Sequence, residues 1–391
     1  MGRLLLAATV AVACAAQTLA QSAPSCLAFP GTGGPSLPKT CISHGGLDRC
    51  WLTYTPTALV NRTEKAAAVM LLHGLSACAD FIGLQTGMIV EAEQRGFYLV
   101  IPQGTFNLNQ AMPAGQEFLA NVSSWNADRC CGAAVVRQID DSGFLAKVVD
   151  NVTATLPVNQ KRFYVYGHSN GAAMAARFAV EHSDKVTAVA AVSFYLIAQV
   201  NAYTSKVPYF AVHGESDETV PFGSSVLFGA GVVAATGNFA AINGCTKGPL
   251  SQSLTVSGKP YTRISYGGCD APRNSEVVLA VVPKGTHQPF PDAPPLNAFI
   301  KFDNFTSGKI ACDFLFDYER VANGTSSASV RTALVSPSPN YDAPVTPAPV
   351  TSAPSTLAPS TRAPSTRAPS TAEQLLPSLA TLALTSWMLI F

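Results

Sequence analysis

Short runs of almost unbroken apolar residues recur along the middle of the chain, and they constrain its fold more than any other feature. The runs are 67–72, 97–101, 162–166, 186–192, 209–212 and 277–282. A strand that is apolar on both faces is typical of a parallel sheet that is covered on both sides. The sequence therefore predicts a buried, mainly parallel central sheet.

Helical stretches are predicted between these runs. Residues 142–152 and 172–182 have helical composition, and Asp140 and Asp141 are placed to cap the first stretch. Alternation of strand and helix predicts an α/β fold, with helices on both faces of the sheet and a single domain. In such a fold the reactive side chains lie on loops that leave the carboxyl ends of the strands.

One of these loops carries a candidate nucleophile. The segment Gly167-His168-Ser169-Asn170-Gly171 follows the strand at 162–166 and precedes an alanine-rich stretch. This is the G-x-S-x-G pattern in the strand, turn and helix context of a nucleophile elbow, which makes Ser169 the predicted nucleophile. We expect His168 to lie beside Ser169 but to point elsewhere.

The same elbow suggests where an oxyanion would bind. The backbone N–H of Asn170 faces the same space as the Ser169 hydroxyl in such a turn. The loop at 71–76 follows the first strand and offers the N–H of Leu75 as the second donor. A plain turn at this loop is the alternative interpretation.

Two further loops offer an acid and a base. The loop at 213–221 contains Glu215, Asp217 and Glu218, and the residues alone leave all three open as the acid. His287 follows the last strand and is the histidine that comes after both the serine and the acid. The order serine, acid, histidine is the chain order of α/β hydrolases. Such a triad activates a serine that is a poor nucleophile by itself.

Longer motifs give a specific resemblance. The motifs are LLHG (71–74), YLVIPQG (98–104), SWNADRCCG (124–132), DDSGFL (140–145), YVYGHSNGAAMA (164–175), HGESDETVP (213–221), NGC with GC (243–245, 268–269) and GTHQPFP (285–291). The chain resembles the secreted esterase family that includes polyhydroxybutyrate depolymerases and feruloyl or acetylxylan esterases. The resemblance implies an α/β-hydrolase fold and a triad of Ser169, Asp217 and His287.

The sequence departs from the family pattern at two loops. Leu75 stands where the family often has cysteine, and Gln288-Pro289 stands where the family often has Thr-Trp. The second loop borders the substrate in the family, so we name Phe290 as a substrate-binding candidate. Trp125 is the other candidate, for which we expect a conformational role, with direct contact to an aromatic acyl group or a sugar as the alternative.

Cysteines and sequons indicate an exported protein. Nine cysteines remain once Cys14 leaves with a signal peptide, and an odd number implies at least one that is free or bonded outside the chain. We expect a disulfide between Cys245 and Cys269, and different partners for the adjacent Cys130 and Cys131. No cysteine or histidine spacing suggests zinc, and the triad implies no metal or organic cofactor. Glycosylation sequons stand at Asn61, Asn121, Asn151, Asn304 and Asn323.

The two ends of the chain are predicted to be processed. Residues 1–20 have the pattern of a secretory signal peptide, and 21–322 form the predicted esterase domain with a cysteine-rich N-terminal segment. Residues 323–374 form a Pro/Ser/Thr-rich stalk. Residues 375–391 form an apolar tail typical of a GPI-attachment signal, with Ser370 or Ser365 as the attachment site. A tail-anchored helix or an unprocessed tail is the alternative.

These observations predict a secreted serine carboxylesterase that is tethered to the cell surface through a lipid anchor. The net charge of +1 argues against nucleic-acid binding. We expect a monomer that acts on feruloyl or acetyl esters of plant cell-wall polysaccharides, with short polyesters as a weaker choice. A serine peptidase on the same fold and a surface adhesion protein with a vestigial site are the alternatives.

Overall fold

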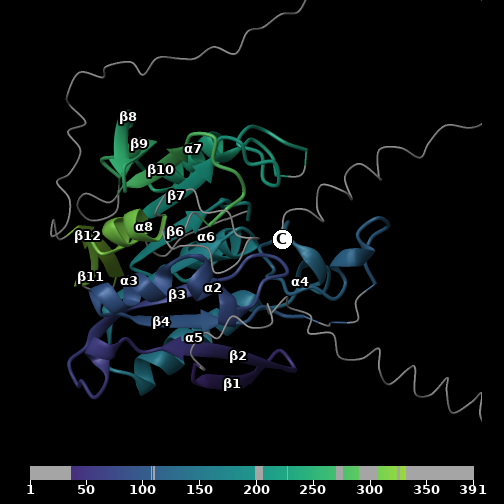
Figure 1. Cartoon of the computed structure of the whole chain (residues 1–391), viewed down its shortest axis with the longest axis vertical. Helices are drawn as coiled ribbons and strands as arrows, with labels where there is room; N and C mark the ends of the chain where they lie inside the picture. The colour runs from purple at the N-terminus through teal and green to yellow at the C-terminus, as the bar shows by residue number, and fades with distance from the viewer. Residues whose placement is uncertain are drawn as a thin grey trace, which may run out of the picture.

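The computed structural model describes residues 37–106, 108, 111–198, 206–226, 228–269, 276–289, 307–323 and 326–331. A ten-stranded sheet runs through the middle of the molecule in the order β1-β2-β4-β3-β5-β6-β7-β10-β9-β8 (Figure 1). Its strands are β1 (Lys39–His44), β2 (Leu47–Tyr54), β3 (Ala66–Leu72), β4 (Tyr98–Pro102), β5 (Val158–His168), β6 (Ala188–Val192), β7 (Tyr209–Gly214), β8 (Lys247–Val256), β9 (Lys259–Gly267) and β10 (Val277–Val282).

The strands from β4 to β10 in this order are parallel, and each of them overlaps one of the predicted apolar runs. This confirms the α/β-hydrolase fold class. Antiparallel pairs that the sequence did not predict extend both edges, through β1 and β2 on one side and β9 and β8 on the other. None of these four strands is buried along its whole length, so they lack the unbroken apolar pattern of the centre.

Helices cover both faces of the sheet. One face packs against α5 (Asp141–Thr155), α6 (Asn170–Glu181) and α7 (Val232–Ile242). The other face packs against α2 (Ala79–Gln85), α3 (Met88–Arg95) and α8 (Ser307–Leu315). The shorter elements are η1 (Thr57–Leu59), η2 (Glu117–Leu119) and α4 (Gly132–Val136).

Strand β3 illustrates how one sequence serves both cores. Ala68, Met70 and Leu72 face one cluster, whereas 67, 69 and 71 face the other. Successive side chains of a strand point to opposite faces, so an unbroken apolar run covers both. Burial on both faces is therefore the direct result of the pattern that predicted the sheet.

The first predicted helix begins as expected. Asp140 is the N-cap of α5, and its carboxylate accepts a hydrogen bond from the Gly143 N–H. Asp141, the second candidate, is instead fully buried and accepts from the Arg49 guanidinium of β2 at 2.6 Å. This buried ion pair ties an edge strand to the helix layer.

A C-terminal hairpin crosses the predicted domain boundary at residue 322. Strand β11 (Tyr318–Asn323) pairs with β12 (Ser326–Arg331), which lies in the segment assigned to the stalk. The hairpin is tied to the sheet because the Tyr164 hydroxyl donates to the Tyr318 carbonyl. The predicted signal peptide, the rest of the stalk and the apolar tail with Ser365 and Ser370 lie outside the described residues. No helix within the described ranges is long and apolar enough to cross a membrane.

The disulfides differ from the prediction at one place. Cys41 pairs with Cys50, and Cys245 pairs with Cys269. Cys78 is also disulfide-bonded. Cys312 is a free and buried cysteine within the described part of the chain.

The prediction of different partners for Cys130 and Cys131 was wrong. The two are bonded to each other across a cis peptide bond, which brings their Cα atoms to 3.0 Å. The prediction expected peptide strain to prevent a disulfide between adjacent cysteines.

The sequons occupy varied positions. Asn61 and Asn121 are exposed, and Asn151 is half-buried on α5. Asn323 ends β11, and Asn304 lies outside the described residues. Glycosylation at each of them stays a prediction.

Candidate active site

A sharp turn between β5 and α6 presents Ser169. Its backbone has φ 53° and ψ −127°, outside the usual regions for an L-residue. A Cβ on Gly167 would lie 2.1 Å from the Gly171 carbonyl oxygen, and one on Gly171 would lie 2.4 Å from the Leu72 carbonyl oxygen. Only glycine fits at these two positions, because any side chain would collide with backbone.

The structure brings the three predicted triad residues together. His287 Nε2 lies 2.8 Å from Ser169 Oγ, and His287 Nδ1 lies 2.9 Å from Asp217 Oδ2. The Asp217 side chain is completely buried, whereas Glu215 and Glu218 are exposed. Of the three acids that the sequence left open, Asp217 is the one that reaches the histidine.

The second oxygen of Asp217 is held by backbone. The N–H groups of Thr219 and Val220 donate to Oδ1 at 3.0 and 2.8 Å. Hydrogen bonds to a buried carboxylate offset its loss of hydration and fix its orientation. Oδ2 therefore points at His287 with little freedom to turn away.

Contacts between neighbouring loops position His287. The loop after β7 is tied to the loop after β10, because the Ser216 N–H donates to the Gly285 carbonyl at 2.8 Å. The Ser193 hydroxyl, at the end of β6, donates to the Gln288 carbonyl at 2.9 Å. The carboxyl ends of three neighbouring strands thus hold the histidine loop.

His213 lies behind the acid. Its Nε2 is 2.8 Å from the Val220 carbonyl, to which it donates, and 3.4 Å from Asp217 Oδ2. Burial lowers the pKa of His213 below its ordinary value. A neutral His213 therefore supports the loop that carries Asp217. It does not compete with a protonated His287 for the carboxylate, because it carries no positive charge.

Two backbone N–H groups beside Ser169 are available to an oxyanion. Those of Leu75 and Asn170 donate to no acceptor among the residues that the structure describes. Asn170 is the first residue of α6, where the N–H groups are unpaired and the helix dipole is positive. The oxyanion hole that the sequence predicts at these two N–H groups stays a prediction.

Trp125 is not among the side chains that line the cavity, which agrees with the conformational role expected for it and not with direct substrate contact. It is fully buried, and its indole N–H donates to the His73 carbonyl at 2.9 Å. Its backbone N–H donates to Asn170 Oδ1 at 2.7 Å, and Asn170 Nδ2 returns a bond to the Trp125 carbonyl. Trp125 therefore stabilises the nucleophile elbow from the core side. Its apolar ring can pack in the core because its N–H has an acceptor. Phe290 lies outside the described residues.

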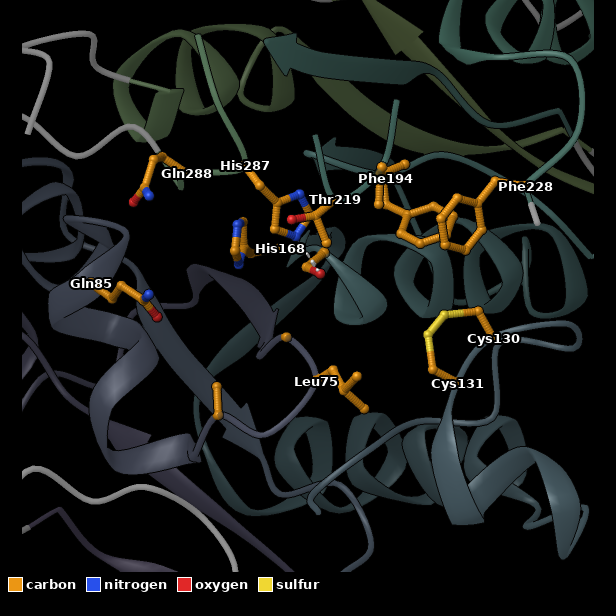
Figure 2. A pocket seen from close by; sticks show the side chains of 14 residues that line it. Leu75, Gln85, Cys130, Cys131, His168, Phe194, Thr219, Phe228, His287 and Gln288 are labelled. Atoms are coloured by element: carbon orange, nitrogen blue, oxygen red, sulfur yellow. Dashed lines mark hydrogen bonds between the residues drawn. A yellow bond between two sulfur atoms is a disulfide. The ribbon is translucent and has the colours of Figure 1, made fainter. Parts of the chain in front are cut away.

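A cavity opens over Ser169, and Figure 2 shows the side chains around it. Apolar groups lie on one side: Phe194, Phe228 and the Cys130–Cys131 pair. Gln85 and Gln288 lie on the other side, with His168 nearer to His287. The cavity around Ser169 therefore has an apolar side and a polar side.

His168 does not point away from the site as expected. It lines the cavity, and its ring centroid is 5.4 Å from that of His287. Burial, together with the neighbouring His287, holds the pKa of His168 well below its ordinary value. The sequence could not reveal this, because the direction of the side chain depends on the strained turn at Ser169.

Other cavity residues were also missed. Phe194 follows the end of β6 after Ser193, so the rule that placed Ser169 and His287 at strand ends could have found it. Phe228 comes from a loop before α7, and Gln85 ends α2. No local pattern marks these two. No group of side chains in the described ranges could hold a metal ion.

Known proteins are similar to this chain over its central part. Residues 57–235 match the family described as phospholipase/carboxylesterase. NocK of Nocardia uniformis, whose name describes an esterase, is 26% identical over 226 residues, which cover 57% of this chain and 58% of NocK. Feruloyl esterase D of Neurospora crassa is 28% identical over 151 residues, which cover 38% of this chain and 48% of that protein. The chain thus spans about half the length of these curated relatives.

Among solved structures, the acetyl xylan esterase from Aspergillus awamori aligns with 71% of this chain and 99% of its own, at 12% identity and a TM-score of 0.46. The parallel sheet and the elbow already define the fold without that alignment. The family match and the esterase relatives agree with the motifs found in the sequence. The chain has the α/β-hydrolase fold and, over its central part, resembles carboxylesterases and feruloyl esterases.

Proposed function

We propose that this protein is a serine carboxylesterase that forms an acyl-enzyme on Ser169. The observation that carries the proposal is the unbroken chain of hydrogen bonds from Ser169 Oγ through His287 to Asp217 Oδ2. The base lies within hydrogen-bond distance of both the nucleophile and the residue that orients the base.

The geometry supports a definite sequence of proton transfers. His287 Nε2 takes the Ser169 proton as Oγ attacks the ester carbonyl, and Asp217 stabilises the imidazolium. The N–H groups of Leu75 and Asn170 bind the developing oxyanion. His287 then protonates the leaving alcohol. A water molecule, activated by the same histidine, releases the acid.

We propose esters of plant cell-wall polysaccharides, with feruloyl or acetyl acyl groups, as the substrate class. Relatives that are named feruloyl esterases support this choice, and so does a cavity with both polar and apolar walls. The proposed location is extracellular, because disulfides such as Cys41–Cys50 and Cys245–Cys269 persist in oxidising compartments. Tethering by a lipid anchor stays part of the proposal.

The test compares the secreted protein with its Ser169→Ala variant. Methyl ferulate, p-nitrophenyl acetate and acetylated xylan are assayed in parallel. We expect turnover of at least one ester, and a loss of more than about a thousandfold in the variant. Equal hydrolysis by both proteins would remove Ser169 from the mechanism. A well-folded wild-type protein with no activity on any ester would remove the esterase function.

A further inference from the structure

The apolar wall of the cavity is built from two separate parts of the chain. The rings of Phe194 and Phe228 meet edge to face, with centroids 5.0 Å apart and an interplanar angle of 75°. The bonded pair Cys130–Cys131 lies on the same side of the site in Figure 2. These groups offer two aromatic rings and a disulfide, with no side-chain hydrogen-bonding atom.

This wall is held in place beside the nucleophile. The Cys130 carbonyl accepts from Asn170 Nδ2 at 3.2 Å, and Asn170 follows Ser169 directly. The Phe228 N–H donates to Ser225 Oγ, and the Phe228 carbonyl accepts from the Tyr195 hydroxyl. The wall is therefore a preformed surface, which can discriminate between ligands at little ordering cost.

The opposite wall has polar atoms without partners. His168 Nε2 and Gln85 Oε1 are buried, and neither has a hydrogen-bond partner in the described structure. His168 is 7% exposed and lines the cavity, and Gln288 lines the same side. The amide groups of Gln85 and Gln288 are the side-chain groups on this wall that can pair with the hydroxyl groups of a ligand.

We propose that the wall of Phe194, Phe228 and the Cys130–Cys131 disulfide is the acyl-binding site, and that it selects aromatic acyl groups over acetyl. The proposal rests on the esterase function above. An ester attacked by Ser169 extends in two directions from its carbonyl carbon. A sugar alcohol needs partners for its hydroxyl groups and matches the polar wall, so the acyl group faces the apolar wall.

Size then separates the two candidate acyl groups. An aromatic acyl group can stack on or meet the edges of the two phenyl rings, and it can contact the sulfur atoms favourably. An acetyl methyl group is too small to cover this surface. The wall therefore contributes binding energy to an aromatic ester that it cannot contribute to an acetyl ester.

The experiment keeps the alcohol constant and changes the acyl group. The kcat/KM values for p-nitrophenyl ferulate and p-nitrophenyl acetate are measured for the wild type and for Phe228→Ala. A matched control is Val226→Ala, on the same loop, where the side chain is fully exposed. The double variant Cys130→Ser/Cys131→Ser tests the disulfide part of the wall.

We expect the wild type to prefer the feruloyl ester by at least about tenfold. Phe228→Ala and the double variant should lose about tenfold or more on the feruloyl ester, and less than about threefold on the acetyl ester. Val226→Ala should match the wild type on both. Activity on the acetyl ester also reports that each variant is folded. Should the double variant not fold, Phe228→Ala decides alone.

Results that contradict the acyl-site assignment differ from results that contradict the esterase function. A wild type that prefers the acetyl ester, or a Phe228→Ala variant that loses equally on both esters, would overturn the acyl-site assignment. The esterase function would survive either result. Absence of Ser169-dependent hydrolysis of both esters would instead overturn the function on which the proposal rests.

Discussion

At the scale of single residues, the two oxygens of Asp217 have separate tasks. Oδ1 accepts from two backbone N–H groups, and Oδ2 accepts from His287 Nδ1. The carboxylate can do both because each of its oxygens is an acceptor. Nδ1 must then carry a proton, which leaves Nε2 free to accept from Ser169.

Asp217→Asn should abolish most of the activity without changing the fold. The amide oxygen would have to take the place of Oδ1, because backbone N–H groups face it. The amide NH2 would then point at His287 Nδ1 and favour the tautomer with its proton on Nε2. We expect kcat on p-nitrophenyl acetate to fall by about 10,000-fold.

Glu215→Gln is the matched control for this variant. Glu215 is on the same loop and is exposed, so its kcat should stay near that of the wild type. A mild effect of Asp217→Asn, within about tenfold of the control, would argue against Asp217 as the acid that orients His287.

At the scale of elements, the site depends on how closely α6 approaches β3. The Gly171 position lies against the carbonyl oxygens of Leu72 and His73, at 2.4 Å from an added Cβ to either atom. The start of the helix therefore packs closely against the loop that carries Leu75. The two proposed oxyanion donors come from these two elements, so their spacing depends on the absence of a side chain at 171.

Gly171→Ala should therefore destabilise the protein and reduce its activity together. The added methyl group meets backbone, which can move only if the helix shifts. We expect the free energy of unfolding to fall by about 1–3 kcal/mol, or more, in urea denaturation. We also expect kcat to fall, since the oxyanion donors separate.

Gly237→Ala, in the middle of α7, is the comparison for this change. A Cβ there would meet only the Tyr266 hydroxyl, at 3.5 Å, which is an ordinary contact. Alanine is a better helix residue than glycine, so this variant should gain about 0.5–1 kcal/mol. Equal effects of the two variants would contradict the argument from close approach.

At the scale of the whole molecule, buried neutral histidines in the loops above the sheet make the stability of the fold depend on pH. His73 ends β3, its Nδ1–H donates to the Gly74 carbonyl, and its Nε2 accepts from the Gly104 N–H. Burial lowers the pKa of His73 from 6.5 to about 4. Burial likewise lowers the pKa of His168 and His213.

The sign of the resulting pH dependence follows from where the proton binds. Below about pH 6.5 the unfolded chain takes up a proton at His73, and the folded protein does so only near pH 4. The stabilisation is complete above pH 6.5 and is lost as the pH falls toward 4. For His73 alone the loss is about 3 kcal/mol.

Urea denaturation between pH 7 and pH 4 measures this effect. As the pH falls, the free energy of unfolding should decline less steeply in His73→Gln than in the wild type. The difference between the two slopes should correspond to about one proton taken up on unfolding. The comparison of slopes does not depend on how stable the variant is at pH 7. Identical slopes in the two proteins would show that folding does not lower the pKa of His73.

The sequence alone determined the parallel sheet and the positions of the reactive loops. Unbroken apolar runs require burial on both faces, and that pattern is local. The carboxyl ends of parallel strands meet at one edge, so Ser169 and His287 could be expected to approach each other from strand order and spacing. Among the three acids, only the family resemblance favoured Asp217, because all three lie on the same loop after the strand end.

The tertiary structure decided the rest, through contacts between distant parts of the chain. Trp125 could have faced a substrate or the core, and the choice depended on the His73 carbonyl as an acceptor. The Cys130–Cys131 bond is the exception, since it joins neighbouring residues, and no pattern in the sequence predicted it. The apolar wall joins Phe194 and Phe228 to that disulfide across long stretches of sequence. No periodicity records such a juxtaposition, because periodicity reports which face of an element is buried and not what it is buried against.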